Sequence, residues 1–119
     1  MDLNFFKRIR VLDGGVGQEL LERGMKPKGT LWSANALLDE SYHHLLFDIH
    51  SDFVKAGAEI IVTATFTTRR KRLRDNKIED KFEYLNIKAG EIAKKTKEFF
   101  PNILIAGGLP PQDVTYVQD

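Results

Sequence analysis

The chain has 119 residues, of which 42% are hydrophobic and 29% are charged, and this composition excludes an intrinsically disordered chain. Its net charge of +1 gives no reason to expect a nucleic-acid or membrane partner. The absence of cysteine excludes disulfides, thiolate metal ligands and a cysteine nucleophile within these residues. Neither a membrane-spanning apolar run nor a signal-peptide pattern is found, so we expect a cytoplasmic protein.

The first predicted strand is a buried strand over residues 9–12, a short apolar run that ends at the Asp-Gly-Gly sequence of residues 13–15. Residues 18–23 suit a short helix, and Gly24 suits its C-terminal stop. Proline and lysine in residues 25–29 then indicate a loop.

Two longer helices and two further strands follow. Apolar side chains recur on one helical face at Tyr42, Leu45, Leu46, Ile49, Phe53 and Ala56. Gly57 can end this helix, and Asp39 or Ser41 can cap its start. Residues 59–66 are apolar on both faces and rich in β-branched side chains, which predicts a buried parallel strand. The second helix has an apolar face of Phe82, Leu85, Ala89, Ile92, Thr96 and Phe99, and residues 103–106 predict a third buried strand.

The predicted order, β-α-β-α-β, implies parallel strands joined by right-handed crossovers, in an open doubly wound sheet or in a barrel. A (β/α)8 TIM barrel needs about 250 residues. This α/β chain can therefore hold only the first β/α units of such a barrel, which stays incomplete within it. We predict one unit over residues 1–119 without an internal boundary, and residues 112–119 show no strong pattern.

Chemistry in α/β folds gathers at the carboxyl ends of the strands, and the first such end carries Asp13. A carboxylate there can hold a substrate ammonium group, act as a base or bind a metal. Alternatively, it caps the next helix or braces a tight turn. The glycines that follow let a ligand approach the backbone. They form no dinucleotide fingerprint, because Leu20 stands where the third glycine would fall, and no Gly-Lys-Ser/Thr phosphate loop follows.

Two further segments carry polar or charged candidates. The threonines of residues 63–68 can donate hydrogen bonds into a pocket, although strand propensity alone explains them and is the favoured interpretation. Phe66 can wall that pocket or pack against the core. The basic run of residues 69–74 can contact phosphates, nucleic acid or an anionic cofactor. We favour a solvated first turn of the next helix, balanced by Asp75, Glu79, Asp80 and Glu83. No interleaved aromatic residues indicate base stacking, which argues against nucleic-acid binding.

The histidines and the tryptophan carry weaker signals. His43 and His50 share a helix face but lie about 10 Å apart, too far to share a metal ion. We predict that both of them, together with His44, are ordinary helix-surface residues. Trp32 can line a pocket mouth or pack on a barrel rim, and the pattern alone leaves both alternatives open.

Several short motifs occur in one order along residues 9–109. They are Asp13-Gly14-Gly15-Val16-Gly17, Glu19-Leu20, Gly24, Leu31-Trp32-Ser33-Ala34, His50, Ala56-Gly57-Ala58-Glu59-Ile60-Ile61 and Thr63-Ala64-Thr65-Phe66. Together they resemble the opening part of the homocysteine S-methyltransferase family. The Leu-Trp-Ser-Ala motif in particular resembles the branch that uses S-methylmethionine or a similar donor.

This resemblance implies the N-terminal portion of a homocysteine-binding (β/α)8 barrel of about 300 residues. The family moves a methyl group from a donor onto the thiol of homocysteine, which makes methionine, and binds zinc through three cysteines. Metal coordination favours the nucleophilic thiolate. By resemblance, Asp13 matches the residue that grips the homocysteine amino group, and Gly14 and Gly15 bring backbone close to the amino acid. Thr65 and Phe66 match pocket positions after the second strand.

Two departures from the family pattern limit what the chain can do. Residues 107–111 read Gly-Gly-Leu-Pro-Pro where the family usually has Gly-Ser-x-Gly-Pro, which alters the donor side of the pocket. The family's zinc cysteines come from late strands of the barrel, and this chain has no cysteine. We therefore assign no catalytic or metal-binding residue within it and expect no catalysis by the isolated 119 residues.

Two alternatives remain open at this point. The chain can be a non-catalytic truncated relative that acts as a binding or interaction module. An open sheet edge and a one-sided core predict that an isolated fragment self-associates, pairs with the remaining barrel segment or is unstable. The second alternative is an unrelated phosphate-binding α/β domain that uses the basic run of residues 69–74.

Overall fold

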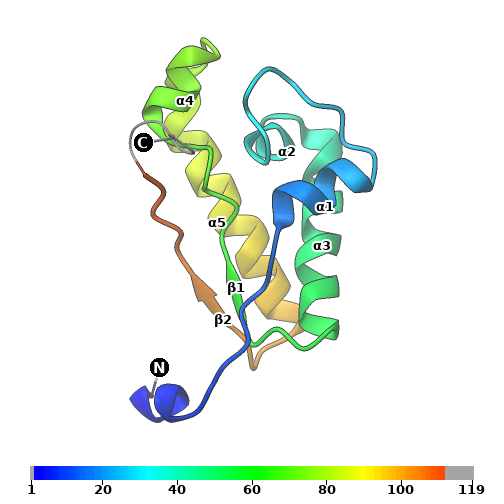
Figure 1. Ribbon diagram of the computed structural model, residues 1–119, viewed down its shortest axis with the longest axis vertical. Coiled ribbons are helices and arrows are strands. Elements are labelled where there is room, and N and C mark those ends of the chain that lie inside the picture. Colours follow the sequence, from blue (N-terminus) through cyan, green and yellow to red (C-terminus); the bar gives the residue numbers. More distant parts are fainter. Residues whose placement is uncertain (1, 112–119) are drawn as a thin grey trace, which may run out of the picture.

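Helices and parallel strands alternate along the chain in the computed structural model, which describes residues 2–111. Strands β1 (Ile60–Val62) and β2 (Leu104–Ala106) pair in parallel. Helices α3 (His43–Lys55) and α5 (Phe82–Phe99) lie against each other and cover one face of these strands (Figure 1). The described residues thus form an α/β unit whose elements follow the predicted order, with one strand fewer.

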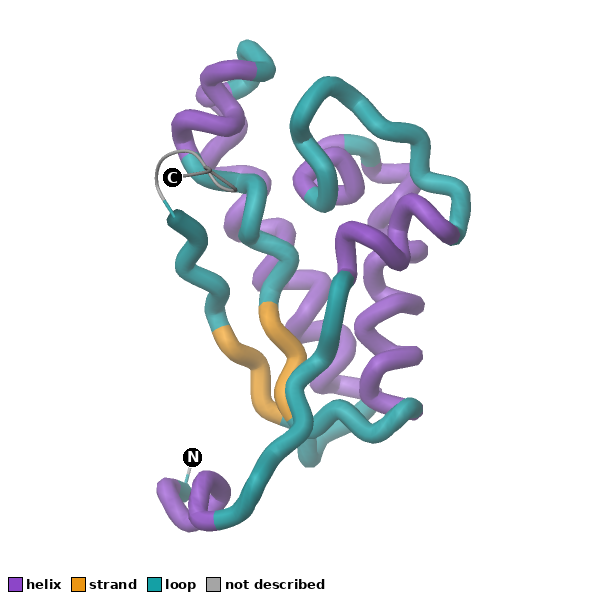
Figure 2. The backbone as a smooth tube through the Cα atoms, viewed as in Figure 1, coloured by secondary structure: helices purple, strands orange, loops and turns teal. Residues whose placement is uncertain are grey.

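The first predicted strand, residues 9–12, runs beside β1 without becoming a regular strand (Figure 2). It forms an isolated parallel bridge between Leu12 and Ile60, and the Asp13 N–H donates to the Ile60 carbonyl at 3.1 Å. The prediction that this segment is buried was wrong, since Ile9 is 92% and Leu12 is 56% exposed. Within residues 2–111 no strand pairs with its other edge, so the ladder is too sparse for a full strand.

The two regular strands are shorter than predicted. Of residues 59–66 only β1 is a strand, because the chain turns just beyond it, where the Thr65 N–H donates to the Thr63 carbonyl at 2.8 Å. Ile60 and Ile61 point to opposite faces and are both buried, as the apolar pattern predicted. β2 is half-buried throughout, which corrects the prediction of a buried third strand, because β2 lies at the edge of the described sheet.

The two long helices begin and end close to where the sequence predicts. The α3 helix ends before Gly57, whose φ of +120° is a conformation that favours glycine. Its buried face includes Leu46 and Ile49, and α5 buries Leu85 and Ala89 against it. These apolar faces explain why the helices pack on each other and on the sheet.

Three short helices surround the carboxyl ends of the strands: α1 (Val16–Glu22), α2 (Ala34–Leu38) and α4 (Arg70–Asp75). Each inserts one fully buried leucine into the main core; these leucines are Leu20, Leu37 and Leu73. Three short 3-10 helices complete the described elements: Leu3–Lys7, Glu40–Tyr42 and Glu79–Lys81. The short helices are held by these apolar anchors, because helices of this length are marginal by themselves.

An ionic cluster ties the N-terminal segment to the start of β1. The Glu59 carboxylate accepts hydrogen bonds from the Val11 N–H at 3.1 Å and from the Arg10 guanidinium at 3.1 Å, and it pairs with Arg8 at 3.5 Å. The backbone donor and these cations lower the pKa of Glu59. This cluster holds the segment that leads into Asp13 alongside β1.

In residues 2–111 no helix combines the length and the apolar character that crossing a membrane requires. The cytoplasmic location stays a prediction. The patternless tail expected over residues 112–119 lies outside the described residues.

Candidate functional site

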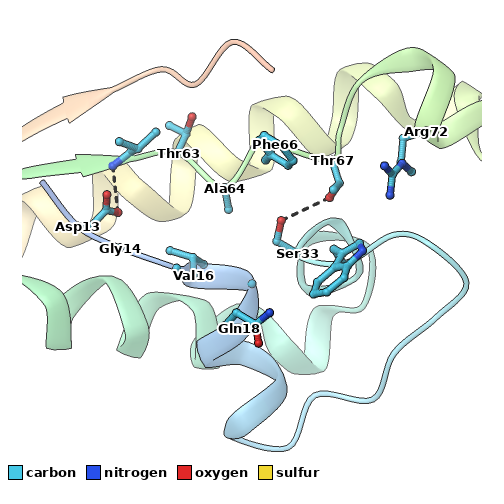
Figure 3. A pocket seen from close by; sticks show the side chains of 14 residues that line it. Asp13, Gly14, Val16, Gln18, Ser33, Thr63, Ala64, Phe66, Thr67 and Arg72 are labelled. Atoms are coloured by element: carbon cyan, nitrogen blue, oxygen red, sulfur yellow. Dashed lines mark hydrogen bonds between the residues drawn. The ribbon is translucent and has the colours of Figure 1, made fainter. Parts of the chain in front are cut away.

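A cavity of about 680 Å³ lies where the first extended segment and β1 end (Figure 3). Its walls come from residues 13–18, from Trp32 and Ser33 before α2, from residues 62–64, from Phe66 and Thr67, and from Arg72 of α4. This volume is within the range of about 300–1,000 Å³ that is typical of small-molecule pockets. The cavity therefore occupies the carboxyl end of the strands, as predicted for an α/β fold.

Asp13 lines this cavity and is braced by β1. Its Oδ2 accepts a hydrogen bond from the Val62 N–H at 3.2 Å. Burial raises the pKa of the half-buried Asp13 carboxyl above 3.8, and the bond from Val62 opposes that effect. The predicted alternative of a helix cap is excluded, because Gly15 is the N-cap of α1 and no side chain caps that end. The bracing alternative is compatible with a ligand role, since the same carboxylate faces the cavity.

Gly14 and Gly15 also line the cavity, but they differ in what their lack of a side chain does. A Cβ on Gly14 would lie 3.2 Å from Cε1 of Phe53, which is tighter than most such contacts. A Cβ on Gly15 would meet only Gln18, at an ordinary 3.8 Å. Packing against α3 therefore accounts for Gly14, while Gly15 leaves room beside the cavity.

Thr65 is placed against the loop after β2 and not among the residues that line the cavity. Its hydroxyl donates to the Gly108 carbonyl at 2.9 Å, and it accepts from the Thr63 hydroxyl at 3.1 Å. The Gly108 N–H in turn donates to Thr63 Oγ1 at 3.2 Å. A Cβ on Gly108 would approach Thr65 Oγ1 to 3.0 Å. The two threonines thus clamp the end of β1 to the chain that follows β2.

We expect Thr65→Val to lower the free energy of unfolding by about 1–2 kcal/mol, because the half-buried Gly108 carbonyl loses its donor. Thr65→Ser keeps the hydroxyl and should retain most of that stability. Urea unfolding of the complete protein that contains this chain measures the difference. Unchanged stability with a large loss of homocysteine affinity would instead make Thr65 a direct ligand contact.

Phe66 walls the cavity, which decides between the two predicted alternatives for it. It is 45% exposed and lines the cavity opposite the segment that carries Asp13 and Val16 (Figure 3). Behind it, the buried Arg69 guanidinium donates to the Phe66 carbonyl at 3.1 Å and lies 5.8 Å from the ring centroid. Arg69 therefore braces this part of the wall.

Trp32 and Thr67 form the far side of the cavity. Trp32 is 48% exposed and has a φ of +50°, a left-handed conformation that is rare for a bulky residue. Its place in the cavity wall supports the pocket-mouth alternative. Thr67 Oγ1 donates to the Leu31 carbonyl at 2.5 Å and accepts from the Ala34 N–H at 3.1 Å. Sequence reasoning did not single out Thr67 by itself, because these partners are distant in the chain.

His50 was predicted to lie on a helix surface, and that prediction was wrong. Its side chain is fully buried, and neither ring nitrogen has a hydrogen-bond partner among the described residues. Burial lowers the pKa of His50 to about 4, so the ring is neutral at pH 7. The available signal was its position four residues after Leu46, which places both on one helical face. His43 is half-buried, with Nε2 at 2.8 Å from the Leu37 carbonyl, whereas His44 is exposed as predicted.

The basic run of residues 69–74 was predicted to form the solvated first turn of the next long helix, and this too needs correction. It forms the separate helix α4, with Arg69 before it and Leu73 buried in the core. The predicted balancing by acidic residues is confirmed for two pairs, Lys71–Asp75 at 3.4 Å and Arg74–Glu79 at 2.8 Å. A buried leucine inside a short basic helix explains why the run is not simply solvated.

A zinc ion does not fit the residues present. The chain has no cysteine, and the described residues contain no group of three or more His, Asp or Glu side chains placed to hold a metal ion. The cavity offers Asp13 as its carboxylate, which is too few ligands for a structural or catalytic zinc site. The site geometry therefore supports binding of a small polar molecule and no metal chemistry from these residues.

Comparison with known proteins places this α/β unit in a family of enzymes. The family described as Homocysteine S-methyltransferase matches residues 10–119. Homocysteine S-methyltransferase 2 of Zea mays is 37% identical over 91 residues, which are 76% of this chain and 26% of that protein. Homocysteine S-methyltransferase 2 of Saccharomyces cerevisiae is 36% identical over 78 residues, or 59% of this chain and 24% of that protein.

The fold agrees with a solved member. The metallated form of the homocysteine methyltransferase MmuM from Escherichia coli superposes with a TM-score of 0.76 at 28% identity. The match covers 91% of this chain and 40% of that one. The chain belongs to the homocysteine S-methyltransferase family, and it corresponds to the N-terminal part of family members. It spans about a quarter of the length of the maize and yeast relatives.

Proposed function

We propose that the complete protein containing this chain transfers a methyl group from a donor such as S-methylmethionine to homocysteine, with methionine as the product. The observation that carries the proposal is the half-buried Asp13 carboxylate in a cavity at the carboxyl end of the strands. The residues that line this cavity lie within the part of the chain that matches the family. A carboxylate in such a place attracts an ammonium group strongly, because neighbouring protein excludes much of the screening water.

The substrate-binding role divides among the predicted residues. Asp13 holds the homocysteine ammonium group, and the backbone of Gly14 and Gly15 lies beside the amino acid, with Gly15 leaving room for it. Phe66 supplies an apolar wall for the carbon chain of homocysteine. Thr65 acts behind these residues by keeping the end of β1 in position. Positioning of donor and acceptor is itself a large part of catalysis in a two-substrate displacement.

The transfer is a displacement at one carbon. The homocysteine sulfur forms a bond to the methyl carbon, the bond between that carbon and the donor sulfonium breaks, and the thiol proton passes to solvent. The donor leaves as a second methionine when it is S-methylmethionine. We assign thiol activation to residues outside this chain, since the zinc ligands implied by the family resemblance are absent here.

The proposed barrel also accounts for the unpaired parts of the sheet. Residues 9–12 and β2 form its two outer edges within the described chain, and Val11 and Leu12 are more than half exposed. In a closed (β/α)8 barrel both edges pair with further strands, and the face away from the helices becomes the packed interior. We infer that the remaining β/α units supply these partners, whether in the same chain or in another.

The test is an assay of the complete protein with homocysteine and S-methylmethionine, with methionine measured by chromatography. We expect methionine formation that needs both substrates, and no turnover by a polypeptide limited to residues 1–119. Tight homocysteine binding without methionine formation by the complete protein would favour the alternative, a non-catalytic binding module. Absence of homocysteine binding would reject the proposal altogether.

A further inference from the structure

Arg72 stands apart from the other basic residues of α4, because it lines the cavity. Lys71 and Arg74 point to acidic neighbours, with which they form ion pairs on the surface. Arg70 lies over the Phe82 ring at 4.1 Å from its centroid. The sequence alone could not distinguish Arg72 from the other basic residues of this run. Which of these side chains faces the cavity depends on how α4 is placed in the folded structure.

The Arg72 side chain is held in place by neighbours from two segments. Its Nη1 donates to the Thr30 carbonyl at 2.6 Å. Asn76 fastens the same pair of segments, because its Nδ2 donates to the Arg72 carbonyl and to Thr30 Oγ1, each at 2.9 Å. The guanidinium is thereby oriented before any ligand arrives, which lowers the entropic cost of binding one.

The charge of Arg72 is not neutralised by the described part of the chain. No ion pair among residues 2–111 includes Arg72, although several of its neighbours are paired. A guanidinium has five N–H donors in a planar fork, and the Thr30 carbonyl accepts from one nitrogen. The remaining donors match the geometry of a carboxylate, which arginine binds through two parallel hydrogen bonds.

Arg72 and Asp13 lie at opposite ends of the cavity (Figure 3). The side chains of Val16, Ser33 and Phe66 lie along the cavity between them. In an α-amino acid the ammonium and the carboxylate are attached to the same carbon atom. A homocysteine whose ammonium rests on Asp13 therefore cannot also place its own carboxylate on Arg72.

We propose that Arg72 binds the carboxylate of the methyl donor and thereby selects zwitterionic donors, in which an onium methyl group and a carboxylate belong to one small molecule. This inference rests on the proposed function. Asp13 anchors the acceptor at one end of the cavity, Arg72 anchors the donor at the other, and the reacting sulfur atoms meet between them.

The test is calorimetric titration of the complete protein, saturated with norvaline so that no methyl transfer occurs, with S-methylmethionine and with its carboxamide, which lacks the negative charge. Norvaline carries a methyl group in place of the homocysteine thiol. We expect the unmodified protein to bind the carboxamide about 10- to 100-fold more weakly than the carboxylate. Arg72→Gln should weaken S-methylmethionine binding by a similar factor and leave carboxamide binding within about twofold. Arg72→Lys should recover part of the loss, because it restores charge without the bidentate geometry.

The matched control is Arg74→Gln, which removes a guanidinium from the same helix but not from the cavity wall. It should leave both donor affinities unchanged. Equal affinities of the unmodified protein for the two donors, no donor binding, or equal losses for both donors in Arg72→Gln would overturn the inference. A separate titration of the unmodified protein with homocysteine distinguishes failure of this inference from failure of the proposed function. If homocysteine still binds, only the role of Arg72 is rejected; if it does not bind, the proposed function is rejected.

Discussion

Asp13→Asn is expected to weaken homocysteine binding about 100-fold, because an amide keeps the shape of the carboxylate but not the charge that attracts an ammonium group. The amide oxygen can still accept the hydrogen bond from the Val62 N–H, so the end of β1 keeps its brace. Isothermal titration of homocysteine into the complete protein measures the loss. Asp13→Ala, which removes the brace as well, should bind homocysteine no better than the asparagine variant.

Stability provides the control for this prediction. Burial raises the Asp13 pKa, so ionising the carboxyl above that pKa costs folding free energy. Asp13→Asn should therefore unfold no more easily than the unmodified protein at neutral pH. Homocysteine affinity of the unmodified protein should also decline as the pH falls through a pKa above 3.8, since protonation neutralises the carboxylate. A variant that is less stable but binds homocysteine normally would show that Asp13 only braces the strand end.

The buried His50 should make the protein less stable in mild acid. Its pKa is about 4 in the folded protein, against an ordinary 6.5. Between these two values the unfolded chain therefore binds a proton at this histidine and the folded chain does not. The stabilisation is complete above pH 6.5 and is lost as the pH falls toward 4. Between pH 7 and pH 5 the loss from this one group is about 2 kcal/mol.

His50→Leu tests this assignment, because leucine fills a similar buried space and does not titrate. The free energy of unfolding is measured in urea at pH 7 and at pH 5. Between these two pH values it should fall by about 2 kcal/mol less in the variant than in the unmodified protein. His44→Gln is the matched control, since His44 is exposed and its loss should leave the pH dependence nearly unchanged. A normal titration of the His50 ring near 6.5, observed by NMR, would contradict the buried, neutral state.

Local interactions explain why much of the architecture could be predicted. The apolar faces of α3 and α5 arise from side chains three and four residues apart, which a linear pattern records directly. Gly57 takes a left-handed conformation at the end of α3, as its place after the apolar period predicted. Asp13 could likewise be placed at the end of an extended segment, because the apolar run before it stops abruptly.

The burial of individual side chains depended on partners far along the chain. Residues 9–12 have the composition of a buried strand, yet Ile9 is 92% exposed, because burial needs neighbours on both sides of the sheet. His50 shows the opposite case: it is a polar residue, yet it is fully buried because α3 packs against the other helices. Composition could predict neither outcome, because each depends on which surfaces the surrounding elements cover.

What the sequence by itself determined is the order of the helices and of the two regular strands, the family motifs and the position of Asp13 at the end of the first extended segment. Only the tertiary structure decided that Thr65 contacts the Gly108 carbonyl while Phe66 and Arg72 face the cavity. The physical reason is the range of the interactions. Helical period and caps are decided within a few residues, whereas the Thr30–Arg72 and Thr65–Gly108 hydrogen bonds join segments 42 and 43 residues apart, and these distant contacts build the cavity wall and its support.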